Sequence, residues 1–200
     1  MKTNADSFEQ MGKSIMGKIY PFLINDLKNL YNKPFTNKTI AEIGSGPGFI
    51  LKELQKEDFS KIYGIDISLD MLSRATKRIN TNEKILLINA KAEQLPLKDQ
   101  SLDIIISRGS VFFWKDLEKA FNEIYRVLKK DGFAIIGGGY GISTPDDIIN
   151  EIITYYNSEM NKNKKPKLDL DKMINIMNKI GGKQQIINKP RHGFWITWNK

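Results

Sequence analysis

Ala41-Glu42-Ile43-Gly44-Ser45-Gly46-Pro47-Gly48-Phe49 is the stretch that decides the fold, because it ends an apolar run and opens a helical pattern. Glycines at such a junction let the chain turn tightly and bring bare backbone amides against a ligand. A dinucleotide-binding G-x-G-x-x-G would need glycine where Phe49 stands, and a P-loop would need Gly-Lys-Ser or Gly-Lys-Thr. Alone, this spacing predicts only a tight strand-turn-helix, so further residues must indicate whether it binds a ligand.

A carboxylate at the end of the next predicted strand makes the turn more informative. Gly64-Ile65-Asp66-Ile67-Ser68 places Asp66 there, 18 residues after Gly48. In a doubly wound sheet this position lies beside the first turn, where a carboxylate can accept hydrogen bonds from ribose hydroxyls. Capping of the following helix is the simpler role for an acid, but Ser68 suits that role well. We therefore expect Asp66 to be functional.

Short β-branched runs alternate with helical patterns along the chain, which is typical of βαβ units around a parallel sheet. Near-continuous apolar runs such as Ile104-Ile105-Ile106 suit strands that are buried on both faces. The expected strands are 39–43, 61–67, 85–89, 102–107, 133–137, 184–188 and 193–199. The expected helices are 69–79, 117–129 with Gly132 as its left-handed stop, one opening at Thr144-Pro145, and 170–180.

These elements predict an α/β fold: a Rossmann-like, doubly wound, mostly parallel seven-stranded sheet with helices on both faces. We expect one domain over 1–200, made of a short helical cap (1–38), a core (39–142) and C-terminal helices and strands (143–200). A helical stripe marks the cap, and Pro21 is expected to break or kink it. We expect packing against the sheet in preference to a substrate lid. The stripe consists of Phe8, Met11, Ile15, Met16, Ile19, Leu23, Leu27 and Leu30.

The charge of the chain is unbalanced, with 31 Lys and Arg against 23 Asp and Glu and a net charge of +8. Basic patches attract phosphates, so this charge raises the question of a nucleic-acid or anionic-membrane partner. All but five of the cations are lysines, however, and they are spread along nearly the whole chain. The densest run, 162–167, is broken by Asn163 and Pro166 and indicates a solvated loop. We interpret the charge as lysine-rich surface composition.

The absence of cysteine excludes thiolate nucleophiles, thiolate metal sites and disulfides. His192 is the single histidine, so we expect no metal centre and interpret His192 as a turn residue rather than a base. Charged residues such as Asp6, Glu9 and Lys13 interrupt the N-terminal apolar stretch, so it does not resemble a signal peptide. No run approaches the length of about 18 apolar residues that would span a bilayer. We expect a cytoplasmic protein.

Several motifs resemble those of the class I S-adenosylmethionine-dependent methyltransferases and occur in the same order along the chain as in that family. Within the family, the chain resembles the small-molecule group that includes ubiquinone and menaquinone biosynthesis enzymes. The resemblance covers about half of the chain, from 39 to 139. It rests on the glycine turn, on Asp66, and on two further stretches. These are Ala92-Glu93-Gln94-Leu95-Pro96-Leu97 with Asp99, Ser101, Leu102 and Asp103, and Glu123-Ile124-Tyr125-Arg126-Val127-Leu128-Lys129-Lys130-Asp131-Gly132.

The resemblance implies S-adenosylmethionine as cofactor and S-adenosylhomocysteine as product. The glycines would line the methionine moiety, Glu42 would lie near its ammonium, and Asp66 would hold the ribose. Ile67 and Met71 would flank the adenine. The cofactor-binding residues implied in this way are Glu42, Gly44, Gly46, Gly48, Asp66, Ile67, Met71, Ala92, Glu93 and Ser107.

One residue departs from the family pattern on the adenine side. Lys91 stands where many relatives have an aspartate, and a lysine cannot accept a hydrogen bond from the adenine amino group. Recognition of adenine would therefore shift to Glu93 or to the backbone. The segment after the fourth strand, 107–114, also lacks the Asn-Pro-Pro-Tyr-type motif of amino methyltransferases that act on nucleic acid or protein glutamine.

Methyl transfer from a sulfonium is already chemically activated, so the protein mainly has to align the acceptor and exclude water. We assign no catalytic base. We predict a small-molecule acceptor; the alternatives are an RNA methyltransferase with the lysines as docking surface, and a non-catalytic regulatory module that binds the cofactor. The residues expected on the acceptor side are Tyr20, Arg108, Trp114 and Tyr140, for which simple packing or surface pairing stays open.

Overall fold

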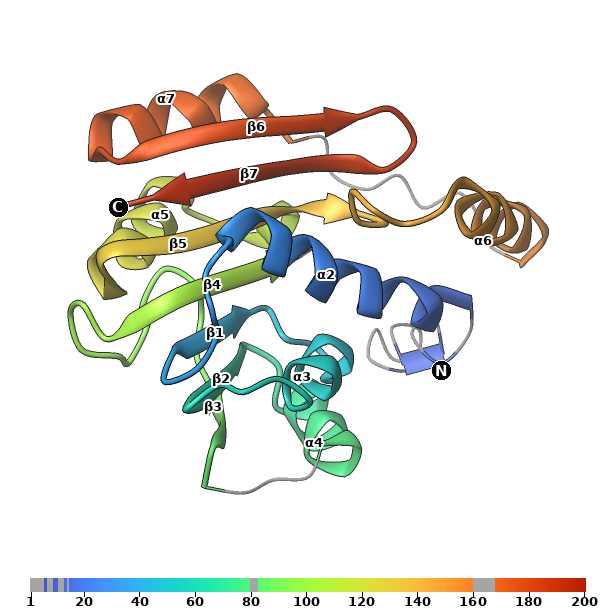
Figure 1. The fold of residues 1–200 in the computed structure, drawn as a ribbon, viewed down its shortest axis with the longest axis horizontal. Coiled ribbons are helices and arrows are strands. Elements are labelled where there is room, and N and C mark those ends of the chain that lie inside the picture. The colour runs from blue at the N-terminus through green and yellow to red at the C-terminus, as the bar shows by residue number, and fades with distance from the viewer. Residues whose placement is uncertain (1–5, 7–8, 11–12, 14, 80–82, 160–167) are drawn as a thin grey trace.

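The computed structural model describes residues 6, 9–10, 13, 15–79, 83–159 and 168–200, which form a sheet between layers of helices (Figure 1). The strands are β1 (Thr39–Ile43), β2 (Lys61–Asp66), β3 (Ile85–Asn89), β4 (Leu102–Arg108), β5 (Leu128–Gly139), β6 (Lys183–Lys189) and β7 (Gly193–Asn199). The helices are η1 (Ile15–Ile19), α2 (Tyr20–Tyr31), α3 (Phe49–Leu54), α4 (Leu69–Arg78), η2 (Val111–Phe113), α5 (Leu117–Val127), α6 (Asp146–Glu159) and α7 (Leu170–Ile180).

The seven strands lie in the order β3-β2-β1-β4-β5-β7-β6. All neighbours pair in parallel except β7, which is antiparallel to both β5 and β6. The chain leaves β1 towards β2 on one side and returns to β4 on the other, so the strand order reverses between β1 and β4. The crevice beyond the carboxyl ends of these two strands is where such sheets bind ligands. The predicted doubly wound, mostly parallel sheet is confirmed.

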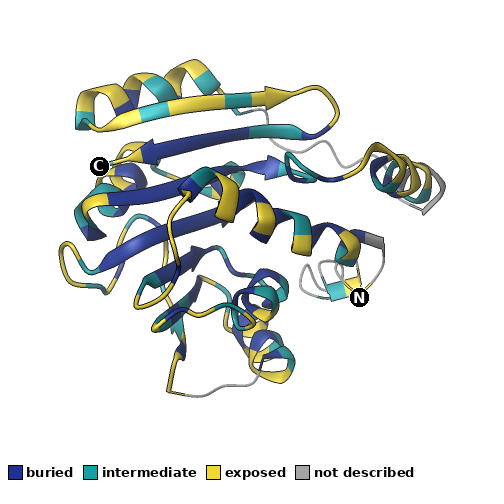
Figure 2. Ribbon diagram, viewed as in Figure 1, coloured by how far each residue is buried: buried dark blue, intermediate teal, exposed yellow. Residues whose placement is uncertain are grey.

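Helices cover both faces of the sheet and build one core on each. Residues of α2, α3 and α6, such as Leu27 and Leu51, pack on one face, and residues of α5 and α7, such as Phe121 and Met177, pack on the other. The central strands are therefore buried throughout, whereas the edge strand β6 is largely exposed (Figure 2). This explains the continuous apolar run in β4, because neither of its faces meets solvent.

The transition from α5 to β5 differs from the expectation. The helix ends at Val127 instead of residue 129, because Leu128 adopts extended backbone (φ −67°, ψ 135°) and pairs with Leu102. Strand β5 therefore begins five residues earlier than the predicted 133. The left-handed residue of this turn is Asp131 (φ 64°), and the prediction that Gly132 takes that role is wrong. A short polar Asp tolerates this conformation better than most residues.

The N-terminal cap packs against the sheet. Pro21 lies in the first turn of α2, where a missing N–H removes no helical bond, so it opens this helix instead of kinking one. Leu23 and Leu27 of α2 are buried in the core. Phe8, Met11 and the lysine-rich run 162–167 lie outside the described residues. Within the described part of the chain, no helix is long and apolar enough to cross a membrane.

Candidate functional site

The glycine turn lies where β1 gives way to α3, and three of its glycines are left-handed. Gly44, Gly46 and Gly48 have φ values of 74°, 53° and 81°. The amides of Gly44 and Ser45 donate to the carbonyl of Ile65 at 2.7 and 3.0 Å, which anchors the turn to the end of β2. The loop is therefore placed at the carboxyl end of the sheet, in the crevice beside β4.

The three positions require glycine for different structural reasons. A Cβ added to Gly44 would lie 2.1 Å from the Cβ of Ser110, and one added to Gly48 would lie 2.9 Å from the Cβ of Ala75 in α4. These two glycines permit close packing. A Cβ added to Gly46 would meet nothing within 4 Å. Gly46 is therefore the position at which bare backbone faces open space and can approach a ligand.

Asp66, at the end of β2, ties this loop to the next helix. Its Oδ2 accepts from the Gly46 amide at 2.7 Å and its Oδ1 from the Ser68 amide at 2.9 Å. Ser68 caps α4 by accepting from the Met71 amide at 3.3 Å, which confirms the predicted capping serine; ligand binding by Asp66 stays a prediction. A carboxylate oxygen can accept more than one hydrogen bond, so both oxygens of the partly exposed Asp66 keep acceptor capacity.

Two buried polar atoms below the loop lack a partner. Among the described residues, neither Oε2 of Glu42 nor Oγ of Ser45 makes a hydrogen bond. Burial raises the pKa of Glu42 well above its usual range; the nearby Asp66 raises it further, while Arg108 opposes both. Buried polar groups are nearly always satisfied, so an unpaired carboxylate oxygen two residues before the glycine turn points to a ligand that supplies donors.

Of the residues expected around adenine, Ile67 and Met71 follow β2, and Ala92 and Glu93 follow β3. Ile67 is 70% exposed at the end of β2, whereas Met71 and Ala92 are buried. The Glu93 carboxylate accepts from the amides of Lys115 and Asp116 at 2.7 and 3.3 Å, so it also holds the loop before α5. The exposed apolar face of Ile67 suits a flat ring against it.

A partly exposed ionic cluster that the sequence did not reveal fixes the segment 95–99. Arg126 of α5 binds Glu123 at 2.6 and 2.8 Å and donates to the carbonyls of Leu95 and Leu97. Glu123 in turn accepts from the Leu95 amide at 2.7 Å. The hydrogen bonds from Arg126 hold the pKa of Glu123 below its usual range, against its burial. Two of the sequence motifs are thus joined to each other in space.

Three of the four predicted acceptor-side residues come together beyond β1 and β4. The guanidinium of Arg108 lies 5.7 Å from the ring centroid of Tyr20 and donates from Nε to the carbonyl of Gly139, the residue before Tyr140. Burial raises the pKa of both tyrosines, and the nearby Arg108 opposes the rise. Trp114 is not part of this group, because it packs edge-on against Phe121 in the core on the other face of the sheet.

Two sets of buried polar contacts stabilise the loops around this group of residues. Ser107 is fully buried, and its Oγ lies 2.6 Å from Oγ of Ser110, which donates to the Ile43 carbonyl. Asp26 of α2 is also buried and accepts from the amides of Ile142 and Ser143 at 2.6 and 2.9 Å. Asp26 was missed at the sequence level; the signal was a single acid inside the apolar stripe of α2. It fastens the cap to the loop after β5.

His192 is also buried, with Nδ1 2.9 Å from the Gly141 carbonyl and Nε2 3.1 Å from Asp146. Its ring therefore links the β6–β7 turn to α6. No group of three or more His, Asp or Glu side chains within the described ranges could hold a metal ion.

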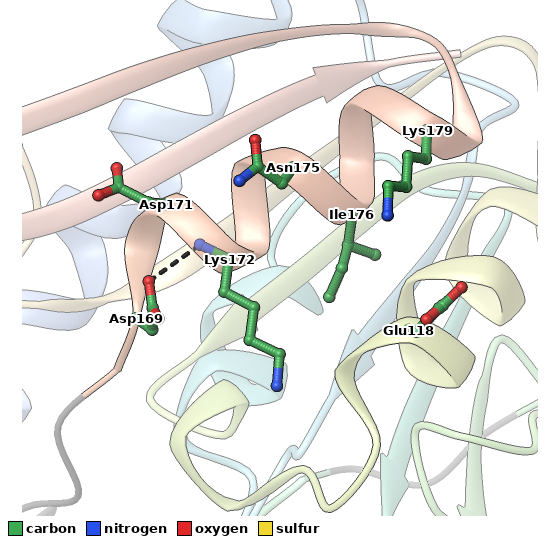
Figure 3. Close-up of a pocket in the computed structure, with 7 residues that line it drawn as sticks. All are labelled: Glu118, Asp169, Asp171, Lys172, Asn175, Ile176 and Lys179. Atoms are coloured by element: carbon green, nitrogen blue, oxygen red, sulfur yellow. Dashed lines mark hydrogen bonds between the residues drawn. The ribbon is translucent and has the colours of Figure 1, made fainter.

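Two surface hollows differ in their relation to this site. One, of about 340 Å³, is lined by Tyr20, Phe49 and Arg78 at the edge of the glycine turn. The other lies between α5 and α7 and is lined mainly by exposed charged side chains (Figure 3). It contains none of the residues around the turn and belongs to the opposite face of the sheet. The glycine turn is therefore the candidate functional site.

A protein from Methanococcus maripaludis, described as an S-adenosyl-L-methionine-dependent methyltransferase, has a crystal structure that superposes on this chain with a TM-score of 0.84. It is 34% identical, and the alignment covers 100% of this chain and 97% of that one. This chain belongs to the S-adenosylmethionine-dependent methyltransferase family. Residues 41–136 also match the model of the methyltransferase domain.

Curated relatives in the family are longer. Human "Arginine-hydroxylase NDUFAF5, mitochondrial" is 30% identical over 115 residues, which is 58% of this chain and 32% of that protein. The chloroplastic 2-methyl-6-phytyl-1,4-hydroquinone methyltransferase 1 of Oryza sativa subsp. japonica is 31% identical over 100 residues, which is 50% of this chain and 30% of the relative. The chain thus spans about a third of the length of these two relatives.

The site suits the cofactor of this family. S-adenosylmethionine carries an ammonium, which can donate to the unpaired Oε2 of Glu42, and ribose hydroxyls, for which Asp66 retains acceptor capacity. It has no phosphate, which agrees with a glycine turn that lacks a lysine. The open space at Gly46 leaves room for the methionine moiety.

Proposed function

We propose that this chain is a methyltransferase that uses S-adenosylmethionine to methylate a small-molecule acceptor. The observation that carries the proposal is the buried, unpaired Oε2 of Glu42 two residues before the glycine turn, together with Asp66, which is bonded at 2.7 Å to the open Gly46. This arrangement offers an acceptor for an ammonium, a surface for an aliphatic chain and an acceptor for hydroxyls at the glycine turn and the two strand ends beside it. Family membership supports the choice of cofactor.

When bound, S-adenosylmethionine supplies an activated methyl group, which bonds to a lone pair of the acceptor as the carbon–sulfur bond breaks and leaves S-adenosylhomocysteine. The chain contributes position. Asp66 fixes the glycine turn by its bond to the Gly46 amide, and Asp26 fixes the loop after β5 against α2. Held geometry of this kind lowers the barrier by removing the entropy of bringing reactants together.

A small acceptor is favoured by what surrounds the site. Tyr20 is 6% exposed and Tyr140 half-buried, so the acceptor side is partly enclosed by α2 and by the loop after β5. The rice relative is named for action on a small hydroquinone, which supports the same class of acceptor. An enclosed aromatic wall suits a compact acceptor better than a polymer, whose backbone needs an open track.

The proposal is tested in two steps. Isothermal titration with S-adenosylhomocysteine should show binding to the wild type and binding at least about tenfold weaker to Asp66→Asn, since a charge-assisted hydrogen bond contributes about 1.5–3 kcal/mol. Asp99→Asn, on a carboxylate that pairs with Arg126 away from the turn, is the matched control and should bind normally.

The second step uses methyl-labelled S-adenosylmethionine with a metabolite extract split by ultrafiltration, with total RNA in a parallel reaction. Label should enter the low-mass fraction. Label in RNA alone would overturn the small-molecule acceptor, and cofactor binding without any labelled product across all fractions would overturn the enzymatic activity.

A further inference from the structure

The guanidinium of Arg108, on the acceptor side, uses only part of its hydrogen-bonding capacity. Nε donates to the Gly139 carbonyl at 2.9 Å, and within the part of the chain that the structure describes no hydrogen bond or ion pair engages Nη1 or Nη2. The side chain is partly buried at the last residue of β4, where the strand opens into the crevice. A guanidinium fixed through one nitrogen presents its two remaining nitrogens as a preset fork.

Two tyrosines flank this fork. The ring of Tyr20 stacks on Phe49 with 5.3 Å between centroids, and the Arg108 guanidinium lies 5.7 Å from the Tyr20 centroid. Tyr140 follows the carbonyl that Arg108 binds. Both tyrosines are close enough to Arg108 for its charge to oppose the rise in their pKa. The partly buried guanidinium of Arg108 therefore lies beside apolar ring surface.

Among the described residues, no acid forms an ion pair with Arg108. Glu42 is on the neighbouring strand, but burial raises its pKa well above the usual range, which favours its neutral form in the cofactor-free protein. In the complex, the ammonium of the cofactor would be the direct partner of Glu42. Asp26 binds the amides of Ile142 and Ser143. A positive charge in a half-buried, aromatic site without an ionic partner attracts an anion.

We propose that Arg108 binds an oxyanion of the methyl acceptor, a carboxylate or a phosphate, through Nη1 and Nη2, while Tyr20 and Tyr140 cover the apolar part of the same molecule. This inference rests on the proposed function and narrows its acceptor to an anionic small molecule. Carboxylate and phosphate share the chemistry that the fork recognises, since each presents two oxygens at matching spacing. Arg108 is thus a specificity-determining residue.

A purely structural role for Arg108 makes a different prediction. If the side chain only supported the Gly139 carbonyl, its removal would lower stability and leave anion binding unchanged. A lysine at 108 could donate to one carbonyl and retain the charge, but it offers no fork. Comparing Arg108→Lys with Arg108→Gln therefore distinguishes the effect of the positive charge from that of the two-nitrogen fork. Measuring anion binding and stability for each variant distinguishes a role in binding from support of the backbone.

The test is calorimetric and does not depend on turnover. Benzoate, phenyl phosphate and uncharged benzyl alcohol are titrated into the wild type saturated with S-adenosylhomocysteine. At least one of the two anions should bind at least about tenfold more tightly than benzyl alcohol, and Arg108→Gln should remove that advantage, since bonds to charged groups contribute about one to two factors of ten. Arg108→Lys should fall between the two. Arg191→Gln, on an exposed arginine bound to Asn150, is the matched control and should behave as the wild type.

The natural acceptor gives a second readout. Labelled product from the metabolite extract should be retained on an anion-exchange column; loss of retention after phosphatase treatment identifies a phosphate, and persistence identifies a carboxylate. Equal binding of charged and uncharged probes, or a labelled product that is not retained, would overturn the role of Arg108. Absence of S-adenosylhomocysteine binding to the wild type would instead overturn the proposed function, so the two failures are distinguishable.

Discussion

Replacing each of the three left-handed glycines by alanine should separate packing from ligand binding. An alanine at any of them pays the cost of left-handed backbone, about 1–2 kcal/mol. At Gly44 the new Cβ also meets the Cβ of Ser110 at 2.1 Å, and such overpacking adds about 1–3 kcal/mol. At Gly46 it meets nothing within 4 Å, so only the backbone strain remains.

These costs translate into measurable shifts. For a chain of this length, 1 kcal/mol corresponds to a change of about 2–4 °C in the unfolding midpoint. Gly46→Ala should therefore lower the midpoint by roughly 2–8 °C and Gly44→Ala by roughly 4–20 °C. Gly48→Ala should fall between them or near Gly44→Ala, because its Cβ would lie 2.9 Å from that of Ala75.

Although Gly46→Ala should lose less stability than Gly44→Ala, it is the variant in which we expect a loss of cofactor affinity. Gly46→Ala puts a methyl group into the open space proposed for the cofactor, so its affinity for S-adenosylhomocysteine should fall at least about tenfold, or 1.4 kcal/mol. Circular dichroism melts and isothermal titration of the same preparations give both quantities. A folded Gly46→Ala variant that binds with wild-type affinity, or a Gly44→Ala variant as stable as Gly46→Ala, would refute this assignment of the glycines.

Three further substitutions test the polar framework. The pKa of Glu42 is higher in the folded protein than in the unfolded chain, so the cofactor-free wild type should lose stability as pH rises through the folded pKa. Glu42→Gln should abolish this loss, because glutamine does not ionise. Urea unfolding across pH 5–9 measures the free energy of unfolding of both proteins. The pKa of Glu123 is lowered in the folded protein, so its contribution to stability is complete above the unfolded pKa near 4.5 and is lost as pH falls through the folded pKa. Glu123→Gln should therefore be less stable than the wild type by about 1.5–3 kcal/mol at neutral pH, and the difference should shrink in acid. Acid-unfolding curves of the two proteins measure this difference. Asp26→Asn can accept through one oxygen only and should lower the unfolding midpoint while sparing S-adenosylhomocysteine affinity, in contrast to Gly46→Ala.

Local sequence patterns predict most of the strands and the glycine turn because their causes are local. Strands β1, β3 and β7 and helix α7 match the expected ranges residue for residue. Each is marked by an apolar run with a glycine, an asparagine or a charged residue at its end. The turn was recognisable because left-handed backbone restricts residue choice, so glycine spacing carries the information directly.

The features that were not predicted depend on contacts between distant residues. The helical pattern continues through Leu128, but pairing with Leu102 draws that residue into β5. Trp114 was expected on the acceptor side together with Arg108, but its contact with Phe121 places it in the core on the other face of the sheet. Asp26 and the Glu123–Arg126 pair act on backbone groups far along the chain, at Ile142 and Leu95, and such partners leave no periodic signal.

The most direct test of the central claim, that the glycine turn with Glu42 and Asp66 binds S-adenosylmethionine, is thermal unfolding with S-adenosylmethionine, S-adenosylhomocysteine and NAD in parallel. At a hundred times the dissociation constant a ligand adds about 2.7 kcal/mol, which is roughly 5–11 °C for this length. Both adenosyl compounds should raise the midpoint by this amount and NAD should leave it unchanged. Stabilisation by NAD and by neither adenosyl compound would contradict the assignment.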